Sequence, residues 1–310
     1  MTDEKHYDVL IIGAGPAGLA AGLYAARARR TTILLERNVT GGQIALTSVV
    51  ENYPGFEEVD GFELGQMMQR QAEKYGMEMG YTEVTGLESR DSLQVVHTKD
   101  GDYTAKAVIL TGGADYVRLG VPGEEELTGK GVSYCATCDA AFFKDQVCAV
   151  VGGGDAAMDE GLFVTRYASK VYVIHRRDQL RASMILQERA FANPKMEFIW
   201  NTVVSEIQGE DAVQRLKLRN VVTGEESDLE VAAVFIFIGQ KPNTDYLKSQ
   251  LKMDNGGHIY VNEWMETEIP GLYAAGDVRV NSARQVVSAA GDGATAAIRA
   301  DHYITDTFKD

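Results

Sequence analysis

Residues 7–18, YDVLIIGAGPAG, decide the fold class of this chain. Their apolar first half is typical of a buried parallel strand, and their second half is a G-x-G-x-x-G turn between such a strand and a helix. An alanine-rich segment then predicts a helix to about Arg30, and residues 32–35 predict a second strand that ends on Glu36. The chain therefore opens with a β-α-β unit of the dinucleotide-binding kind.

The same pattern returns in the middle of the chain. Residues 147–151 predict a strand, three glycines interrupt it, a helix is predicted from Asp155 to about Tyr167, and residues 171–174 predict the next strand. This duplication is far more specific than a lone glycine motif. We expect an α/β protein with two Rossmann-like, three-layer nucleotide-binding domains.

The order of the remaining segments predicts how the two domains share the chain. Residues 271–275 predict a strand near the C-terminus, and residues 289–302 predict a helix. If that strand belongs to the first unit, the first domain is discontinuous and the second domain is inserted into it. The boundaries expected are 1–117 with 243–310 for the first domain and 118–242 for the second, with turn-rich crossings at 118–122 and 239–242 and appended hairpins around 94–98 and 206–223.

Composition excludes several classes of protein. The net charge of −15 argues against nucleic acid or an anionic membrane as the main partner. No apolar run reaches the ~18 residues of a membrane span, and the polar start MTDEKHYD does not resemble a signal peptide. We therefore expect a cytoplasmic protein. Three cysteines and five scattered histidines do not predict a metal site.

The first glycine turn has the residues needed to bind a dinucleotide. Gly13 permits the tight turn, Gly15 lets the backbone approach a pyrophosphate, and Gly18 lets the helix pack closely on the strand. Glu36, at the end of the second strand, can accept hydrogen bonds from ribose hydroxyls and repels a 2′-phosphate. This turn therefore favours FAD or NAD over NADP.

The second turn differs at the ribose position. Gly152 and Gly154 keep the phosphate cradle, with Ala157 in the third position, but no acid ends the next strand. Instead the strand is followed by basic residues, whose guanidinium groups suit a phosphate monoester and so favour NADP. The alternative is a solvated basic face. The residues concerned are His175, Arg176, Arg177 and Arg181.

Cys135-Ala136-Thr137-Cys138-Asp139 is the predicted reactive unit. Two residues between the cysteines let both sulfurs meet on one turn, so a disulfide can form and open in place. Asp139 can give or take the proton that thiol–disulfide exchange moves. Cys148 lies inside a predicted strand, where a free cysteine packs as a small hydrophobe.

Taken together, these stretches resemble the low-molecular-weight thioredoxin reductases from end to end. The matching stretches include GAGPAGLAAGLYAAR, GVPGEEELTGKGVSYCATCDAAFF, GGGDAAMDEG, VIHRRDQLRAS, AAGD and RQVVSAAGDGATAA. Ala140 and Gln240 depart from residues common in the family, without removing a chemical group. The resemblance implies FAD held by Gly13, Gly15, Pro16, Ala17, Gly18, Glu36, Gly42, Gln43, Asn52, Gly112, Asp277, Arg284, Gln285 and Val286. It implies NADPH held by Gly152, Gly154, Asp155, Ala156, His175, Arg176, Arg177 and Arg181.

The resemblance also implies an activity and its partners. Electrons would pass from NADPH to FAD, then to the Cys135–Cys138 disulfide, and then to thioredoxin. Because the disulfide belongs to the inserted domain, one domain would rotate against the other between half-reactions. A homodimer is expected, with Lys130, Phe142 and Phe143 offered to thioredoxin, although the two phenylalanines could equally be core residues.

Three alternatives remain open at the level of the sequence. The acceptor could be a glutaredoxin-like or peroxiredoxin-linked protein, because acceptor choice depends on surface shape. A ferredoxin- or flavodoxin-NADP reductase has the same two-domain organisation, but that branch lacks the cysteine pair. A redox-sensing or zinc-binding protein is disfavoured, because one cysteine pair supplies too few ligands. Which cysteine attacks the acceptor also stays open.

Overall fold

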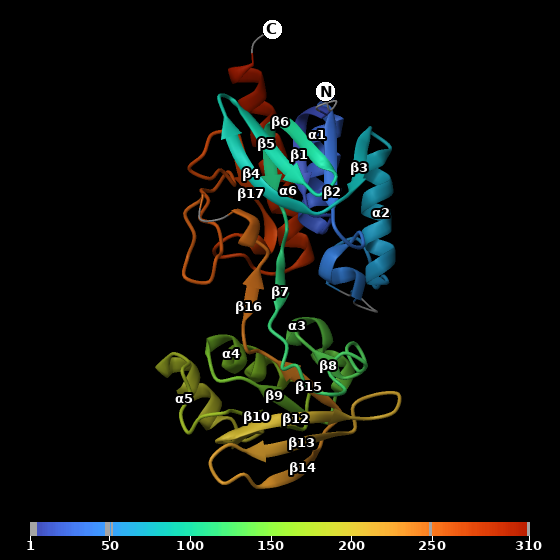
Figure 1. Ribbon diagram of the computed structural model, residues 1–310. Coiled ribbons are helices and arrows are strands. Elements are labelled where there is room, and N and C mark those ends of the chain that lie inside the picture. The colour runs from blue at the N-terminus through green and yellow to red at the C-terminus, as the bar shows by residue number, and fades with distance from the viewer. Residues whose placement is uncertain (1–4, 47–49, 51, 248–249, 309–310) are drawn as a thin grey trace. The chain divides into compact units, whose positions relative to one another are not determined.

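A computed structural model describes residues 5–46, 50, 52–247 and 250–308, so the first four residues of the polar start lie outside it. The chain divides into two compact units (Figure 1). Unit 1 comprises Met1–Asp115 and Lys241–Asp310, and unit 2 comprises Tyr116–Gln240. At the two crossings, β7 (Ala114–Tyr116) and β16 (Gln240–Pro242) pair in a two-stranded sheet.

Unit 1 is built around a parallel sheet. Strand β1 (Lys5–Ile12) lies between β2 (Thr32–Glu36) and β6 (Gly101–Leu110), β3 (Met77–Tyr81) follows β2, and β17 (Leu272–Ala274) pairs with β6. The C-terminal strand therefore belongs to the sheet that the N-terminal strand starts. Unit 1 is made from both ends of the chain.

Two further layers cover this sheet. Side chains alternate along β1, so that Val9 and Ile11 pack with the helices while Leu10 and Ile12 pack on the opposite face. The helices are α1 (Pro16–Arg27), α2 (Gly61–Glu73) and α6 (Val286–Thr307), and the antiparallel strands are β4 (Val84–Arg90) and β5 (Leu93–Thr98). The two antiparallel strands extend from β6, because β5 pairs with β6 and β4 pairs with β5. They form the hairpin that was predicted around residues 94–98.

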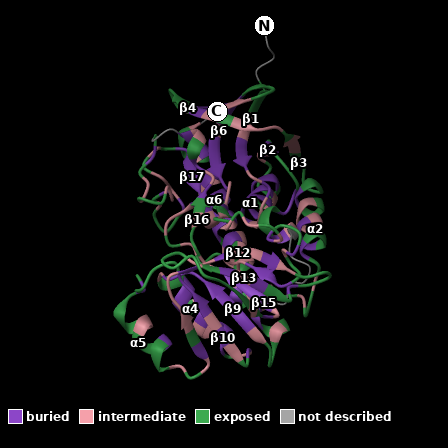
Figure 2. Ribbon diagram, turned by 60° about the horizontal axis from the view of Figure 1, so that its bottom comes forward, coloured by how far each residue is buried: buried purple, intermediate pink, exposed green. Residues whose placement is uncertain are grey.

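Unit 2 repeats the arrangement with its own parallel sheet. The strand order is β11 (Met196–Ile199), β10 (Lys170–Ile174), β9 (Val147–Val151), β15 (Ala233–Ile236) and β8 (Val132–Ser133). Strands β9 and β10 coincide with the predicted segments to within one residue. In Figure 2 the strands β9 and β10 are largely buried, which agrees with their continuous apolar sequences.

Helices and a meander cover the two faces of this second sheet. One face packs against the helices through Ala136, Met158 and Ala190, and the other packs against the antiparallel strands through Leu216 and Leu218. Both units thus have the three layers that were predicted. The helices are α3 (Ala136–Asp139), α4 (Asp155–Val164) and α5 (Met184–Ala192), and the strands are β12 (Thr202–Gln208), β13 (Arg215–Asn220) and β14 (Glu226–Glu230).

Four helix ends differ from the predicted bounds, and one of them is the end of α6, which lies at Thr307 and not at residue 302. Helix α1 stops at Arg27, before Arg29 adopts a positive φ of 65°. Helix α4 stops at Val164. Just beyond this end, the Lys195 ammonium donates hydrogen bonds to backbone carbonyls, at 2.9 Å to the carbonyl of Thr165. Helix α6 begins three residues earlier than expected, at Val286, where a capping box starts it.

Candidate functional site

The first glycine turn is tightly packed at two of its glycines. Gly13 has a φ of 110°, and a Cβ there would lie 2.5 Å from the carbonyl oxygen of Thr111. A Cβ on Gly18 would lie 1.9 Å from the carbonyl oxygen of Gly13. No side chain fits at either position, so the turn and the start of α1 require glycine for steric reasons.

Gly15 is glycine for a different reason. It is the N-cap of α1, and a Cβ there would meet nothing within 4 Å. Pro16 and Ala17 follow as the first helical residues, and proline at this position loses no hydrogen bond. The first backbone amides of α1 therefore border open space, and a pyrophosphate fits there because these amides and the helix dipole favour negative charge.

Glu36 lies beside this turn at the end of β2. Its Oε2 accepts a hydrogen bond from Ala14 N at 2.7 Å, and its Oε1 accepts one from Asn38 N at 2.8 Å. These bonds fix the carboxylate, yet each of its oxygens can accept a second donor. Glu36 can therefore accept from ribose hydroxyls without moving.

Several other residues expected at FAD lie on the loops of unit 1. Gly42 begins a 3-10 turn and has a φ of 59°, and a Cβ there would make a tight contact, 3.2 Å from the Cα of Gly15. The Gln43 amide donates to Asp115 at 3.0 Å, and Gly112 follows β6. Gly42 and Gln43 thus lie on the segment after β2, and Gly112 lies on the loop after β6.

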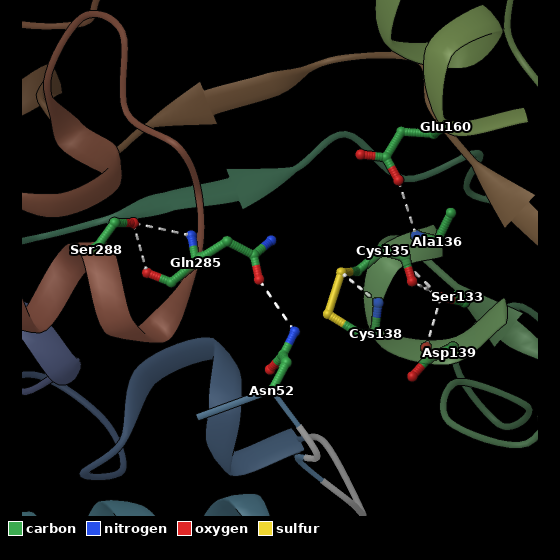
Figure 3. The surroundings of a disulfide bond; sticks show 9 residues. All are labelled: Asn52, Ser133, Cys135, Ala136, Cys138, Asp139, Glu160, Gln285 and Ser288. Atoms are coloured by element: carbon green, nitrogen blue, oxygen red, sulfur yellow. Dashed lines mark hydrogen bonds between the residues drawn. A yellow bond between two sulfur atoms is a disulfide. The ribbon is translucent and has the colours of Figure 1, made fainter. Parts of the chain in front are cut away.

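A second group of these residues lies around the start of α6. Asn52 Nδ2 donates to Gln285 Oε1 at 3.2 Å, and the hydroxyl of Ser288 donates to the Gln285 carbonyl at 2.9 Å (Figure 3). Arg284 precedes this cap and is exposed, and Val286 is the first residue of α6. The start of α6 thus joins residues from distant parts of unit 1.

Asp277 follows β17 in a buried turn. Burial raises the pKa of Asp277, and the hydrogen bond from the Ser282 hydroxyl, at 2.8 Å, opposes that rise. The turn is held by Asp292, which the sequence analysis missed. Asp292 accepts from Gly276 N at 3.1 Å and from two nitrogens of Arg279 at 2.7 and 3.0 Å.

The cysteine pair of unit 2 forms a closed disulfide. Cys135 and Cys138 are bonded, with their Cα atoms 5.3 Å apart. Cys135 is the N-cap of α3, and its Sγ accepts a hydrogen bond from Cys138 N at 3.2 Å. Both residues are partly accessible. A thiolate can therefore reach this disulfide without unfolding the segment.

Asp139 lies on the same short helix and is partly buried. Burial raises the pKa of its carboxyl, although the Ser133 hydroxyl donates to it at 2.6 Å and opposes the rise. Ser133 Oγ also accepts from Cys135 N at 3.1 Å, so it connects the acid to the cysteine pair (Figure 3). A carboxyl with a raised pKa is suited to proton transfer nearer neutral pH.

Two residues near the disulfide were not predicted. Ser133 is one, and a hydroxyl two residues before a C-x-x-C was the only local signal for it. Glu160, from α4, is the other, and its Oε2 accepts from Ala136 N at 3.2 Å (Figure 3). Nothing in the local sequence associates Glu160 with the cysteines, because 24 residues separate it from Ala136.

The second glycine turn repeats the geometry of the first. Gly152 has a φ of 152°, and a Cβ there would lie 2.5 Å from the Phe237 carbonyl oxygen and 2.6 Å from Ala157 Cβ. Gly154 is the N-cap of α4, and a Cβ there would meet nothing within 4 Å. Ala156 is exposed beside it, and Asp155 Oδ1 accepts from Ser183 N at 2.5 Å. This turn too leaves open space at a helix N-terminus.

The basic residues after β10 divide into two kinds. Arg176, Arg177 and Arg181 are exposed, and within the described part of the chain no carboxylate pairs with them. His175 is only 4% exposed, and its imidazole packs against Gly153, where a Cβ would lie 2.3 Å away. The arginines can therefore pair with a phosphate, whereas His175 supports the turn by packing against Gly153.

The buried state of His175 has a chemical consequence. Its Nε2 is buried without a hydrogen-bond partner in the part of the chain that the structure describes. Burial lowers the pKa of His175, and the neighbouring arginines lower it further. Burial therefore favours the neutral ring, and its unsatisfied nitrogen lies next to Gly153 of the turn, where a Cβ would lie 2.6 Å from it.

The other cysteine and the two phenylalanines have separate environments. Cys148 is fully buried in β9, and burial raises its pKa to about 12, so it is inert. Phe143 packs on Phe235 with ring centroids 6.0 Å apart. Phe142 is 46% exposed, and Lys130 is exposed as well. Of the two rings, Phe142 is the one that faces solvent.

Within the ranges that the structure describes, no group of three or more His, Cys, Asp or Glu could hold a metal ion. In those same ranges, no helix has both the length and the apolar content needed to cross a bilayer.

Known proteins are similar to this chain in sequence and in fold. A family model described as pyridine nucleotide-disulphide oxidoreductase matches residues 7–293. A thioredoxin reductase of Bacillus subtilis (strain 168) is 48% identical over 307 residues, covering 99% of this chain and 97% of that protein. The crystal structure of thioredoxin reductase from Streptococcus pyogenes MGAS5005 has a TM-score of 0.94 and 47% identity, covering 98% of this chain and 100% of that one. A thioredoxin reductase from Giardia duodenalis has a TM-score of 0.92 and 35% identity, covering 97% and 100%. The chain therefore belongs to the pyridine nucleotide-disulphide oxidoreductase family.

Proposed function

We propose that the chain is a thioredoxin reductase that passes electrons from NADPH through FAD and the Cys135–Cys138 disulfide to thioredoxin. The observation that carries this proposal is the closed, accessible disulfide with Asp139 beside it, on the unit that also has the three exposed arginines. Relatives named thioredoxin reductase match nearly the full length of the chain, which supports the same function.

The FAD site is assigned to unit 1. The amides at the start of α1 would hold the pyrophosphate above Gly15, and Glu36 would accept from the ribose hydroxyls. Asp277 and the start of α6 would hold the rest of the cofactor, with Gln43 and Asn52 from the loops. When bound, FAD supplies a two-electron relay between a nicotinamide and a disulfide.

The NADPH site is assigned to unit 2. The amides at the start of α4 would hold the pyrophosphate above Gly154, and Arg176, Arg177 and Arg181 would bind the 2′-phosphate. His175 would support the turn by packing its buried ring, including Nε2, against Gly153. At the ribose position unit 1 has the negatively charged Glu36, whereas unit 2 has positively charged arginines.

The disulfide residues perform the thiol chemistry. Once Cys135 and Cys138 are reduced, one thiolate attacks the disulfide of thioredoxin and forms a mixed disulfide, releasing one thioredoxin thiol. The second cysteine then displaces the other thioredoxin sulfur and restores Cys135–Cys138. Two electrons and two protons reach thioredoxin in each cycle. Asp139 takes and returns a proton, helped by its raised pKa.

Both electron-handling parts of unit 2 must use one flavin. The arginines and the disulfide belong to the same unit, and we propose that one orientation of that unit brings only one of them to the flavin. We infer that unit 2 rotates about the crossings β7 and β16 between half-reactions. Lys130 and Phe142, which are exposed, are candidates to contact thioredoxin, and the enzyme is expected to be a cytoplasmic homodimer.

Purified protein tests this function directly. It should be yellow, and it should oxidise NADPH in the presence of thioredoxin and a disulfide dye. A Cys138→Ser variant should keep its yellow colour and lose thioredoxin-linked turnover, because exchange needs both sulfurs. Full turnover by this variant would refute the disulfide route. A parallel assay with a glutaredoxin-like acceptor decides between the two classes of partner.

A further inference from the structure

Glu124 is a buried carboxylate outside the site described above. It is 3% exposed and lies between the first crossing and the cysteine pair. Its Oε1 accepts from Leu119 N at 2.9 Å and from the Tyr134 hydroxyl at 2.7 Å, and its Oε2 accepts from Gly120 N at 2.7 Å. All three of these donors are neutral groups.

A carboxylate that is buried among neutral donors stabilises a fold poorly, because its charge has lost its hydration. Desolvation of the charge costs several kcal/mol, and an apolar residue of similar size often stabilises a protein as well or better. Hydrogen bonds to a buried charge do, however, fix their donors in one geometry. Glu124 therefore contributes a defined position for the residues that it binds.

The residues that Glu124 fixes belong to two functional segments. Leu119 and Gly120 lie in the loop 117–122, which follows β7 directly. Tyr134 is covalently followed by Cys135, and its ring stacks on Tyr116 at the end of β7, with centroids 5.0 Å apart and an angle of 18° between the rings. The crossing is thus joined to the cysteine segment twice, by the carboxylate and by the stacked rings.

We propose that Glu124 and Tyr134 are positioning residues that clamp the loop 117–122 to the segment carrying the redox disulfide. This inference rests on the proposed function, in which unit 2 turns about its crossings. With the clamp closed, a movement at the crossing carries Cys135 and Cys138 along as one rigid piece. With the clamp open, the loop absorbs part of the movement and the disulfide reaches its electron donor less often.

One peptide bond reports on the clamp without any cofactor. The amide nitrogen of Leu119 is both a donor to Glu124 and the leaving group when trypsin cleaves after Arg118. Cleavage there requires the clamp to open first, and its rate under native conditions follows the opening equilibrium. Loss of one hydrogen bond to a buried charge should raise that equilibrium about tenfold.

Three variants separate the possibilities. Tyr134→Phe removes one hydroxyl and keeps the stacked ring, Glu124→Gln places an amide against backbone donors, and Glu126→Gln is a matched control on an exposed neighbour. The first two should raise cleavage after Arg118 about tenfold, identified by fragment mass, and the control should not. Thermal melting shows whether each variant is folded, and Tyr134→Phe is the milder change.

Activity then distinguishes positioning from simple stabilisation. In the first two variants, thioredoxin-linked turnover should fall several-fold while NADPH-driven reduction of ferricyanide, which needs no disulfide, stays unchanged. Unchanged cleavage in both variants overturns the clamp. Raised cleavage with an unchanged ratio of the two activities overturns its positioning role. A wild-type protein that reduces ferricyanide but not thioredoxin contradicts the proposed function, and the cleavage experiment still decides the clamp.

Discussion

Replacing Arg176 and Arg177 together with alanine should remove most of the preference for NADP over NAD that we propose for unit 2, because only Arg181 of the three arginines remains. Both side chains are exposed, and in the described part of the chain neither pairs with an acid. Their removal therefore costs little folding stability. What is lost is their interaction with a ligand phosphate.

The size of the effect follows from the exposure of these arginines. A hydrogen bond to a charged partner contributes about 1.5–3 kcal/mol, and exposed groups lie at the lower end of that range. Two such arginines give about 3 kcal/mol, which corresponds to a rise of about 150-fold in the dissociation constant for NADP⁺. NAD⁺ has no 2′-phosphate, so its affinity should stay within about twofold.

Calorimetric titration measures this difference without turnover. Adenosine 2′,5′-bisphosphate and AMP isolate the phosphate contribution, and the Michaelis constants for NADPH and NADH give the same comparison in the enzyme. Raising the ionic strength should weaken NADPH binding in the wild type more than in the variant. Arg219→Ala, which removes an exposed arginine on β13, is the matched control. An equal loss for both nucleotides would refute the reasoning.

Three further changes test other parts of the structure. Asp139→Asn should lower thioredoxin-linked turnover about 10²–10⁴-fold. Because burial raises the pKa of Asp139 above its usual ~4, its contribution to stability is lost as pH rises through that raised value. Urea unfolding should therefore show the variant gaining stability relative to the wild type between pH 4 and pH 8. Gly15→Ser keeps a good N-cap but fills the open space at the turn, so less FAD should bind. The ratio of absorbance at 450 nm to 280 nm, which reports bound flavin, should therefore fall, while the melting temperature of the apoprotein is unchanged. Asp292→Asn leaves the half-buried Arg279 without its charge partner, and urea unfolding should show a loss of about 3 kcal/mol; a loss below 1 kcal/mol would contradict that role.

Local patterns predicted the parts of the fold that depend on local physics. A strand, a glycine turn and a helix each depend on neighbouring residues, so β9 and β10 were predicted almost to the residue. The roles of Gly13 and Gly18 likewise follow from sterics within one turn. The hairpin predicted around residues 206–223 of unit 2 is present as β12 and β13, whereas β14, which continues the meander, lies beyond the predicted range.

Residues whose role depends on how the chain packs in three dimensions could not be predicted in this way. Glu124 stands in PGEEEL, a stretch that is typical of a solvated loop, and only the packing of Tyr134 and the loop 117–122 buries it. Asp292 lies on a helix surface that Arg279 covers. His175 was expected beside the arginines as a ligand-binding residue, and its position under Gly153 became visible only in three dimensions.

The discontinuity of unit 1 has a consequence for synthesis on the ribosome. Strand β17 and helix α6 complete a sheet that β1 begins, and a Cβ on Gly293 of α6 would lie 1.9 Å from the Ala17 carbonyl oxygen of α1. The N-terminal segment must therefore wait for roughly 200 residues to be made after Asp115, which takes roughly 10–40 s in a cell. During that time unit 2 can fold and close, while the apolar surface of α1 and β6 is exposed. The cysteine pair is thus in place before unit 1 is complete, and this chain should depend on chaperones mainly through its first 115 residues.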